Sequence, residues 1–158
     1  MNYNLKLVIM AKNEIKVDPE DKGLLDYYSV WIDHNGYAIC DKMINRKRSR
    51  YRLHRLIMNC HEKDKEIDHI NRDVLDNRKA NLRIVSSGQN SFNRKTLGKY
   101  RGGEKLPSGN YSARIGKKPI RIGTFKTAEE AYEAYKKAAL DKYGFLPYDI
   151  QGVYYRCG

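Results

Sequence analysis

Residues 66–90, EIDHINRDVLDNRKANLRIVSSGQN, constrain the fold of this chain more than any other stretch. Its four asparagines are Asn71, Asn77, Asn81 and Asn90. Asparagine forms helices and strands poorly and is favoured where it caps, turns or holds another group. KEIDHI and LRIVS on either side of the polar run predict short strands, and SGQNSFNRK predicts a helix capped by Ser86 or Ser87. The expected order is strand, long polar loop, strand and helix.

The Asp68–His69 pair within this stretch suggests phosphodiester chemistry. Cleavage requires a base to take a proton from water and a divalent metal ion to stabilise charge on the phosphate. Histidine titrates near neutrality and suits the base, while an aspartate and an asparagine carbonyl offer the oxygen ligands that Mg²⁺ prefers. Neighbouring residues of a regular strand point to opposite faces, so the pair can share a site only if the strand ends or bends there.

LHRLIM (53–58) and EIDHINRDVLDNRKANLRIVSSGQNSFNR (66–94) look very much like the ββα-metal module of the HNH nucleases. Within that group, the phage and intron-associated homing endonucleases are the most similar. The resemblance covers about residues 50–95. The segment 17–38 also resembles the leader that these proteins often carry, with a less specific pattern.

The resemblance implies a role for each matching residue. His69 would be the general base, and Asn81 would be a structural residue that orients it. Asp68 and Asn90 would be the ligands of one Mg²⁺ or Mn²⁺ ion per site. Asn77 would shape the loop. The histidine of the HRL motif, His54, would pack or contact DNA.

The second half of the chain predicts a small separate domain. YSARIGK and PIRIGTF alternate apolar and polar residues, so each strand should have a buried and a solvated face, with Ile120 among the apolar positions. TAEEAYEAYKKAALDKYG predicts a helix with a capping box from Thr127 to Glu130 and a stop at Gly144. A sheet covered on one face by this helix would turn Arg114 and Arg121 outward.

Residues 100–147 look like the DNA-binding domain of the plant APETALA/ethylene-response-factor family, through YRG, ARI, IGTF and the helix TAEEAYEAYKKAAL. The resemblance implies a three-stranded antiparallel sheet packed on one helix. Its expected DNA contacts are Arg101, Arg114, Arg121, Lys117 and Lys118. Other positions of that face carry Glu104, Leu106, Gly116 and Pro119, where the plant proteins often have Arg or another contact. The plant recognition sequence therefore does not transfer.

The positive charge of the chain favours a polyanionic partner. The net charge is +12, and residues 42–56 contain seven Lys or Arg and no acid. Residues 95–121 contain eight Lys or Arg against Glu104. Two basic stretches suggest two contact surfaces on one long nucleic acid. In the first stretch, the candidate DNA contacts are Arg52, His54 and Arg55.

Three further features bound the class of protein. No apolar run approaches the ~20 residues of a membrane span, and the first residues lack a signal-peptide pattern. The cysteines Cys40, Cys60 and Cys157 are odd in number and far apart, which indicates reduced thiols and a cytoplasmic protein. Residues 27–42 predict a hairpin with a tight two-residue turn at Asn35–Gly36.

The sequence therefore predicts an α+β protein with three parts: a β-rich leader plus nuclease module over 1–95, a DNA-binding domain over 96–150, and a tail over 151–158. The expected activity is that of a metal-dependent homing-type HNH endonuclease that nicks double-stranded DNA as a monomer. Three alternatives stay open. They are a non-catalytic DNA-binding regulator, an RNA-binding or RNA-cleaving protein, and a restriction-type nuclease.

Overall fold

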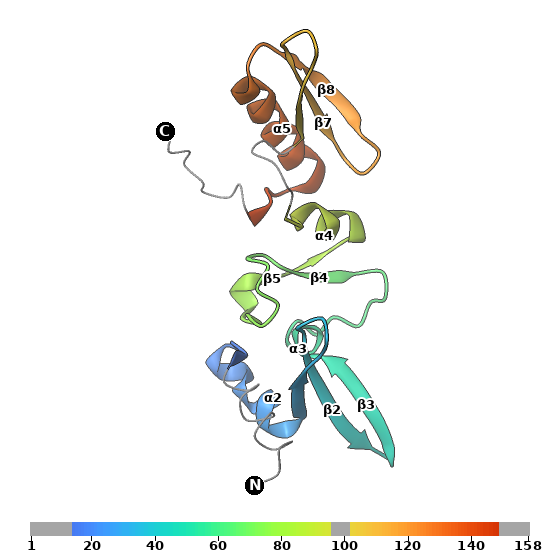
Figure 1. Ribbon diagram of the computed structural model, residues 1–158. Coiled ribbons are helices and arrows are strands. Elements are labelled where there is room, and N and C mark those ends of the chain that lie inside the picture. The colour runs from blue at the N-terminus through green and yellow to red at the C-terminus, as the bar shows by residue number, and fades with distance from the viewer. Residues whose placement is uncertain (1–13, 96–101, 149–158) are drawn as a thin grey trace. The chain divides into compact units, whose positions relative to one another are not determined.

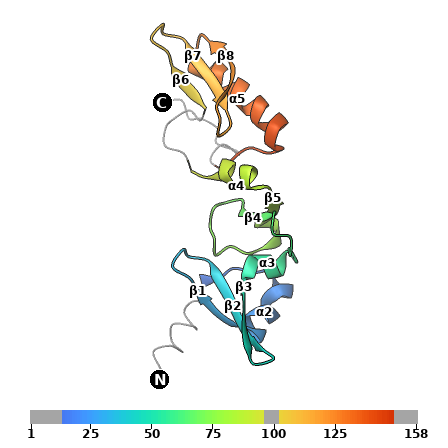
Figure 2. The same ribbon diagram turned by 90° about the vertical axis from the view of Figure 1, so that its right-hand side faces the viewer.

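The computed structural model describes residues 14–95 and 102–148, and the chain divides into two units, Met1–Asn90 and Ser91–Gly158. The division falls inside helix α4 (Ser87–Asn93), five residues before the predicted boundary after residue 95 (95 − 90 = 5). The predicted DNA contact Arg101 and the tail 151–158 lie outside the described residues. Figures 1 and 2 show the elements of each unit from two sides.

The first unit begins with two short helical segments and an antiparallel sheet. These elements are η1 (Pro19–Asp21), α2 (Lys22–Tyr27), β1 (Ser29–Ile32), β2 (Ala38–Ile44) and β3 (Lys47–Arg52), with β2 in the centre of the sheet. Asn45 and Arg46 join β2 to β3 with φ values of 48° and 60°. That conformation is typical of a two-residue turn that follows the twist of the strands.

The predicted hairpin over 27–42 is confirmed, but its predicted turn is wrong. Gly36 N–H donates to the carbonyl of Asp33, so His34 and Asn35 are the central residues of the turn. Gly36 follows them with a φ of 83°. The Asp33 carboxylate accepts hydrogen bonds from the backbone N–H groups of Asn35 and Tyr37, at 2.9 Å each. This side chain selects the longer turn, an effect that the Asn-Gly pair alone does not reveal.

Helix α3 (Leu53–Ile57) follows β3 directly and closes the first core. Leu53, Val30 and Cys40 are fully buried there. The remaining buried members of this core are Ile15, Ala38, Ile57, Cys60, Ile67 and Leu82. The core therefore joins the leader, the first sheet, α3 and the β4–β5 hairpin into one body.

Strands β4 (Glu66–His69) and β5 (Leu82–Val85) pair antiparallel and are joined by a long loop that ends in η2 (Lys79–Asn81). Helix α4 begins directly after Ser86. Ser86 N–H donates to Gln89 Oε1 at 2.9 Å, and Gln89 N–H donates back to Ser86 Oγ at 3.4 Å. This reciprocal cap confirms the predicted helix start. The predicted order of strand, loop, strand and helix is present.

The second unit has a sheet of β6 (Gly103–Lys105), β7 (Tyr111–Ile115) and β8 (Ile120–Phe125), with β7 in the centre, and helix α5 (Ala128–Tyr143). Thr127 and Glu130 form the predicted capping box, and Gly144 ends the helix with a φ of 80°. Tyr135 and Ile115 are buried in its core with Phe92, whose ring stacks on Tyr143 at 4.1 Å.

The expected separation into buried and solvated strand faces is only partly correct. Ile120 is 57% exposed, whereas Ser112, expected on the solvated side, is 1% exposed. An irregularity between Ala113 and Arg114 leaves Ile122 as an extra residue of β8, because Ala113 pairs with Gly123 while Arg114 pairs with Arg121. Ile120 still pairs with the buried Ile115, so its exposure reflects its place as the first residue of β8.

Each unit thus mixes helices with small antiparallel sheets. Within residues 14–95 and 102–148, no helix combines the length and the apolar character needed to cross a bilayer.

Candidate active site

His69 is the last residue of β4, and its side chain is enclosed. It is 4% exposed. The ring centroid of His54 lies 5.1 Å away with the planes at 83°, and the ring of Tyr37 lies 6.1 Å away. His69 Nε2 is 3.4 Å from Oδ1 of Asn77, which is fully buried. Two aromatic rings and one amide therefore fix the orientation of the imidazole.

The surroundings of His69 keep the ring neutral. Burial lowers its pKa, while the contact with Asn77 and the nearby carboxylates of Asp68, Asp73 and Asp76 act in the opposite direction. An amide oxygen only accepts hydrogen bonds, so a neutral His69 donates Nε2–H to Asn77 and carries its lone pair on Nδ1. The ring is therefore prepared to accept a proton at Nδ1.

His54 packs edge-on against the His69 ring and is 3% exposed. Its ring meets Tyr37 at 5.6 Å as well as His69. Burial, followed by the charges of His69, Arg52 and Arg55, lowers the pKa of His54 to about 3. The structure thus places this residue as a neutral packing partner of His69.

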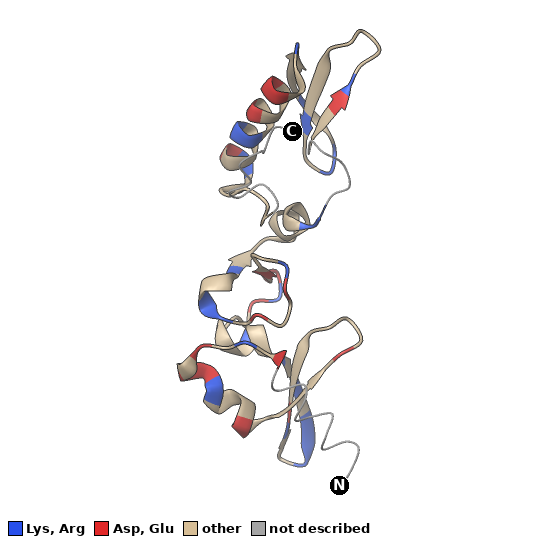
Figure 3. Ribbon diagram, turned by 60° about the vertical axis from the view of Figure 1, so that its left-hand side comes forward, with Lys and Arg blue, Asp and Glu red and all other residues tan. Residues whose placement is uncertain are grey.

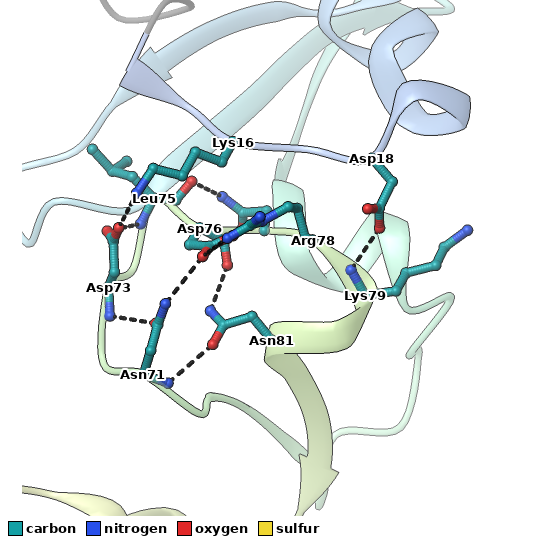
Figure 4. A network of polar contacts seen from close by, with 10 residues as sticks. Lys16, Asp18, Asn71, Asp73, Leu75, Asp76, Arg78, Lys79 and Asn81 are labelled. Atoms are coloured by element: carbon teal, nitrogen blue, oxygen red, sulfur yellow. Dashed lines mark hydrogen bonds and ion pairs between the residues drawn. The ribbon is translucent and has the colours of Figure 1, made fainter. Parts of the chain in front are cut away.

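The loop after His69 is organised by Asn81 (Figure 4). Its Oδ1 accepts from Asn71 N–H at 3.0 Å, its Nδ2 donates to the Asp76 carbonyl at 2.7 Å, and its own carbonyl accepts from Ile70 N–H at 2.8 Å. One side chain therefore joins the start of the loop to its far side. The direct contact with His69 is made by Asn77, so the orienting role suggested for Asn81 would act through this loop.

Asp76 is the charged centre of the loop and is 1% exposed. Arg78 Nε and Nη2 each donate to its carboxylate at 2.7 Å, and Asn71 Nδ2 donates at 3.0 Å. The Arg78 hydrogen bond, opposed by burial, lowers the pKa of Asp76 to about 2. Asp76 therefore remains a carboxylate throughout the physiological pH range.

The leader segment supports the same loop from outside. Lys16 N–H donates to the Leu75 carbonyl at 2.9 Å, and Asn77 N–H donates to the Lys16 carbonyl at 2.8 Å. Asp18 accepts from Lys79 N–H at 2.8 Å (Figure 4). The residues before the first sheet therefore help to hold the amide that contacts His69.

The residues predicted to bind metal lie along the other face of the hairpin. Asp68 is paired with Arg83 across the two strands, and Arg83 Nε and Nη2 donate to Asp68 Oδ2 at 2.8 and 2.6 Å. Glu66 shares this face, and Asn90 of α4 donates its amide N–H to the Glu66 carboxylate. The strand pairing is regular through His69, so Asp68 and His69 point to opposite faces of β4.

The donor chemistry of Asp68, Glu66 and Asn90 fits a hard divalent cation. All three carry carboxylate or amide oxygens, which Mg²⁺ and Mn²⁺ prefer. Asn90 uses its amide nitrogen toward Glu66, so its oxygen is the atom suited to a cation. In the described part of the chain, no three His, Cys, Asp or Glu side chains gather as a metal cluster, so any site here depends on the asparagine.

The predicted DNA contacts differ in how they are held. Arg52 is exposed, with its guanidinium 4.8 Å above the Tyr37 ring. Arg55 donates to the Lys65 and Glu62 carbonyls at 3.0 and 2.7 Å, so it stabilises the loop after α3. Arg114 and Arg121 are exposed neighbours on β7 and β8, and Lys117 and Lys118 are exposed in the turn between those strands.

The sequence suggests no role for Glu66 or Asp76, and it suggests for Asn77 only that it shapes the loop, whereas the structure also places Asn77 in contact with His69. Glu66 stands two positions before Asp68, and that spacing on a strand already places both on one face. Asp76 and Asn77 follow the turn, but their partners, Arg78 and His69, depend on how the loop folds back. Of these three roles, only that of Glu66 could have been inferred from the sequence.

Comparison with known proteins agrees with this geometry. Residues 51–92, which include α3, His69, Asn77, Asn81 and Asn90, match the model of a family described as HNH endonuclease. This segment is similar to the HNH endonuclease domain. The match is confined to the part of the chain that holds the enclosed imidazole and its loop.

One relative extends the likeness. A protein of Acanthamoeba polyphaga mimivirus, described as an uncharacterized HNH endonuclease, is 28% identical over 123 residues. The aligned stretch takes in 77% of this chain and 66% of the relative, so this chain spans slightly less than two thirds of that protein. No solved structure matches.

Proposed function

We propose that this protein is a metal-dependent endonuclease of the HNH type that hydrolyses a phosphodiester bond in duplex DNA. The observation that carries the proposal is the coincidence of two features. The enclosed, neutral His69, held by Asn77 and a loop organised by Asn81, lies inside the segment that matches the HNH endonuclease family.

In this proposal His69 is the general base. Nδ1 takes a proton from the attacking water while Asn77 keeps the other ring nitrogen protonated. His54 and Tyr37 keep the ring in one orientation, which removes the need to order it at the moment of reaction. Asn81 acts one step further away, by fixing the loop that carries Asn77.

Asp68 and Asn90 would hold one Mg²⁺ or Mn²⁺ ion, with Glu66 as the neighbouring carboxylate. The side chains of Asp68 and His69 leave β4 on opposite faces, but the strand ends at His69, so a phosphate bound at this end of the strand would be within reach of both the ion and the imidazole. When bound, such an ion would stabilise the charge that develops on the phosphate and on the leaving oxygen. Arg83 holds the Asp68 carboxylate in position through its two hydrogen bonds. Asn90 is fixed by its bond to Glu66.

We further propose a homing-type enzyme that nicks as a monomer. The resemblance of residues 66–94 to phage and intron-associated enzymes supports the homing type. A single HNH segment supports the cutting of one strand per bound monomer, because a second cut needs a second site. The viral relative, itself described as an uncharacterized HNH endonuclease, is consistent with a mobile or viral setting.

The second unit would anchor the enzyme on DNA in the manner of the APETALA/ethylene-response-factor domains. Its exposed basic side chains on β7, β8 and the turn between them support this role. A two-stranded β-ribbon fits the major groove, where base edges can be read. The proposed contacts are Arg101, Arg114, Arg121, Lys117 and Lys118.

The proposal is tested by incubating supercoiled plasmid that carries DNA from the gene's own neighbourhood with the protein. Wild type should produce nicked circles with Mg²⁺ or Mn²⁺ and none with EDTA. Asn90→Ala and Asp68→Asn should require much more metal or fail to cut. Plasmid that stays intact with either metal, while still being bound, would favour a DNA-binding regulator instead.

A further inference from the structure

A second basic surface lies on β3, and only the last two residues of this strand, Tyr51 and Arg52, fall within the segment that matches the HNH family. Figure 3 marks the Lys and Arg positions of the ribbon in blue. Arg48, Arg50 and Arg52 alternate along the strand, so they share one face. The cross-strand register places Arg50 opposite Asp41. The other face of the sheet carries Val30 and Cys40, which are fully buried in the core. The arginine face is therefore the outward one.

Asp41 organises this face. It is 4% exposed and accepts ionic contacts from Arg48 Nε at 3.1 Å and Arg50 Nε at 2.9 Å. Trp31 Nε1 donates to the same carboxylate at 3.2 Å. One buried anion thus holds two guanidinium groups and one indole in a common arrangement.

Aromatic rings fix the arginines further. The guanidinium of Arg50 lies 5.0 Å from the Trp31 ring centroid, and that of Arg52 lies 4.8 Å from the Tyr37 ring centroid. Stacking on an aromatic face leaves the in-plane N–H groups of a guanidinium directed outward. A restrained side chain also loses less conformational entropy when a ligand binds.

The charge and spacing of the face fit a phosphate backbone. Arg48 and Arg50 remain 66% and 52% exposed despite their contacts with Asp41. Three cations against one carboxylate leave the face positive, and residues 42–56 contain no acid that could reduce this charge. Alternate strand residues are about 7 Å apart, so neighbouring arginines can engage separate phosphates in bidentate fashion.

We propose that the outward face of β1–β2–β3, formed by Arg48, Arg50 and Arg52 with Asp41, Trp31 and Tyr37, is a second DNA-contact surface that binds the phosphate backbone of duplex DNA. The proposal rests on the proposed DNA substrate but not on cleavage. Phosphate contacts of this kind fix position and register on the duplex and carry no direct sequence information.

A pocket of about 350 Å³ extends this surface toward α3. Arg50, Arg52 and Arg55 line it together with His61. Its cationic lining is continuous with the arginine face through Arg50 and Arg52. A DNA backbone that runs along β3 would therefore also meet cationic side chains in this pocket.

The test measures binding without cutting, by fluorescence anisotropy in EDTA with a duplex of about 30 base pairs, roughly three helical turns. Arg48→Ala/Arg50→Ala is compared with Lys42→Ala/Lys47→Ala, which removes the same charge from the opposite face of the same sheet. Each lost phosphate contact lowers the slope of log affinity against log salt by about 0.9. The arginine pair should lower the slope by about 1.8, and the lysine pair should leave it nearly unchanged.

The variant Asp41→Asn tests whether DNA binding depends on how Arg48 and Arg50 are held or only on their positive charge. Added positive charge alone would tighten binding, whereas loss of the anion that holds Arg48 and Arg50 should weaken it. Circular dichroism and a thermal melt verify that each variant is folded. Equal effects of the two double variants, or tighter binding by Asp41→Asn, would overturn the proposal.

Two further outcomes separate this proposal from the nuclease assignment. Wild type that binds no duplex DNA would overturn both together. A wild type that nicks plasmid, with an arginine pair that binds as well as wild type, would overturn only the second surface. Stronger dependence on Arg48 and Arg50 with an RNA duplex of equal length than with DNA would also contradict it.

Discussion

The loop between β4 and β5 and the strands β7 and β8 use polar side chains in opposite ways. In the loop, Asp76, Asn77 and Asn81 are buried and make their hydrogen bonds to one another, to the backbone and to His69. On β7 and β8, Arg114 and Arg121 are exposed. Arg114 forms an ion pair with the exposed Glu104 at 3.6 Å, which is too long and too solvated to hold the guanidinium firmly.

This difference separates two demands on a nuclease. A general base must be held in one orientation, and buried polar networks supply that rigidity because each unsatisfied partner is costly. A surface that tracks DNA must exchange water and counterions for phosphates, which exposed cations do readily. Substitutions in the loop should therefore damage stability, whereas substitutions on β7 and β8 should damage binding alone.

The largest effect on stability is expected at Asp76. Asp76→Ala should lower the free energy of unfolding of the first unit by about 2–3 kcal/mol, because it leaves Arg78 and Asn71 without their buried acceptor. Urea unfolding followed by the fluorescence of Trp31, the sole tryptophan of the chain, measures this unit. Asp73→Ala is the control, since the Asp73–Lys16 pair is exposed and should contribute about 1 kcal/mol or less. Similar losses at both positions would contradict the contrast.

The next effect is a dependence of stability on pH that His54 causes. Its pKa is about 3 in the folded protein against 6.5 as the reference value, so the unfolded chain takes up a proton first as the pH falls. The stability that the neutral His54 contributes should be fully present above about pH 6.5. Below that pH, the free energy of unfolding should decrease by up to about 1.4 kcal/mol per pH unit.

Urea unfolding at about pH 7.5 and about pH 5.5 checks this dependence. His54→Gln should flatten it, because glutamine takes up no proton. A residual slope of the same sign should remain, since burial also lowers the pKa of His69. An unchanged slope in the variant would show that His54 is not the group responsible.

A smaller loss of stability is expected in the second unit at Thr127. Thr127→Ala removes the side chain that accepts from Glu130 N–H at 3.1 Å. The loss should be about 1 kcal/mol, as is usual for a helix cap. Far-ultraviolet circular dichroism should record it, while the Trp31 transition stays in place. A shift of the Trp31 transition would indicate that the two units unfold together.

The smallest effect on stability is expected at Arg114. Arg114→Ala should change the free energy of unfolding by about 0.5 kcal/mol or less, because its ion pair is exposed. DNA binding should weaken by about 1–3 kcal/mol if the guanidinium reads a base edge. A loss that is equal on all duplex sequences would indicate a phosphate contact. Glu104→Gln, which frees the arginine without removing it, should bind at least as tightly as wild type.

Much of the fold follows from local patterns. The strands around residues 66–85, the caps at Ser86 and Thr127, and the stop at Gly144 were predictable, because each depends on a few neighbouring residues. The turn at Asp33–Gly36 and the exposure of Ile120 were not. The first depends on a carboxylate that selects among turns, and the second on where β8 begins, which the alternation of residues does not encode.

The candidate site, too, was only partly predictable from the sequence. Asp68 and His69 stand out by residue type, whereas the roles predicted for Asn81 and Asn90 follow from the resemblance to the HNH nucleases. Their contacts were not predictable, because they are formed between segments far apart in the chain. The leader residue Lys16 contacts Leu75 and Asn77 through its backbone, which no side-chain pattern reveals. The pairing of Asp68 with Arg83 likewise depends on the register of β4 and β5.

The central claim is that His69 is needed to cleave DNA that the basic surfaces bind. It is tested most directly by comparing His69→Ala with Arg114→Ala. Supercoiled plasmid containing the gene's neighbourhood is incubated with each protein and Mg²⁺, and affinity for the same DNA is measured in EDTA. His69→Ala should bind like wild type and nick at least about 100-fold more slowly, whereas Arg114→Ala should bind more weakly and still nick at saturating protein. Nicking by His69→Ala at the wild-type rate would contradict the account.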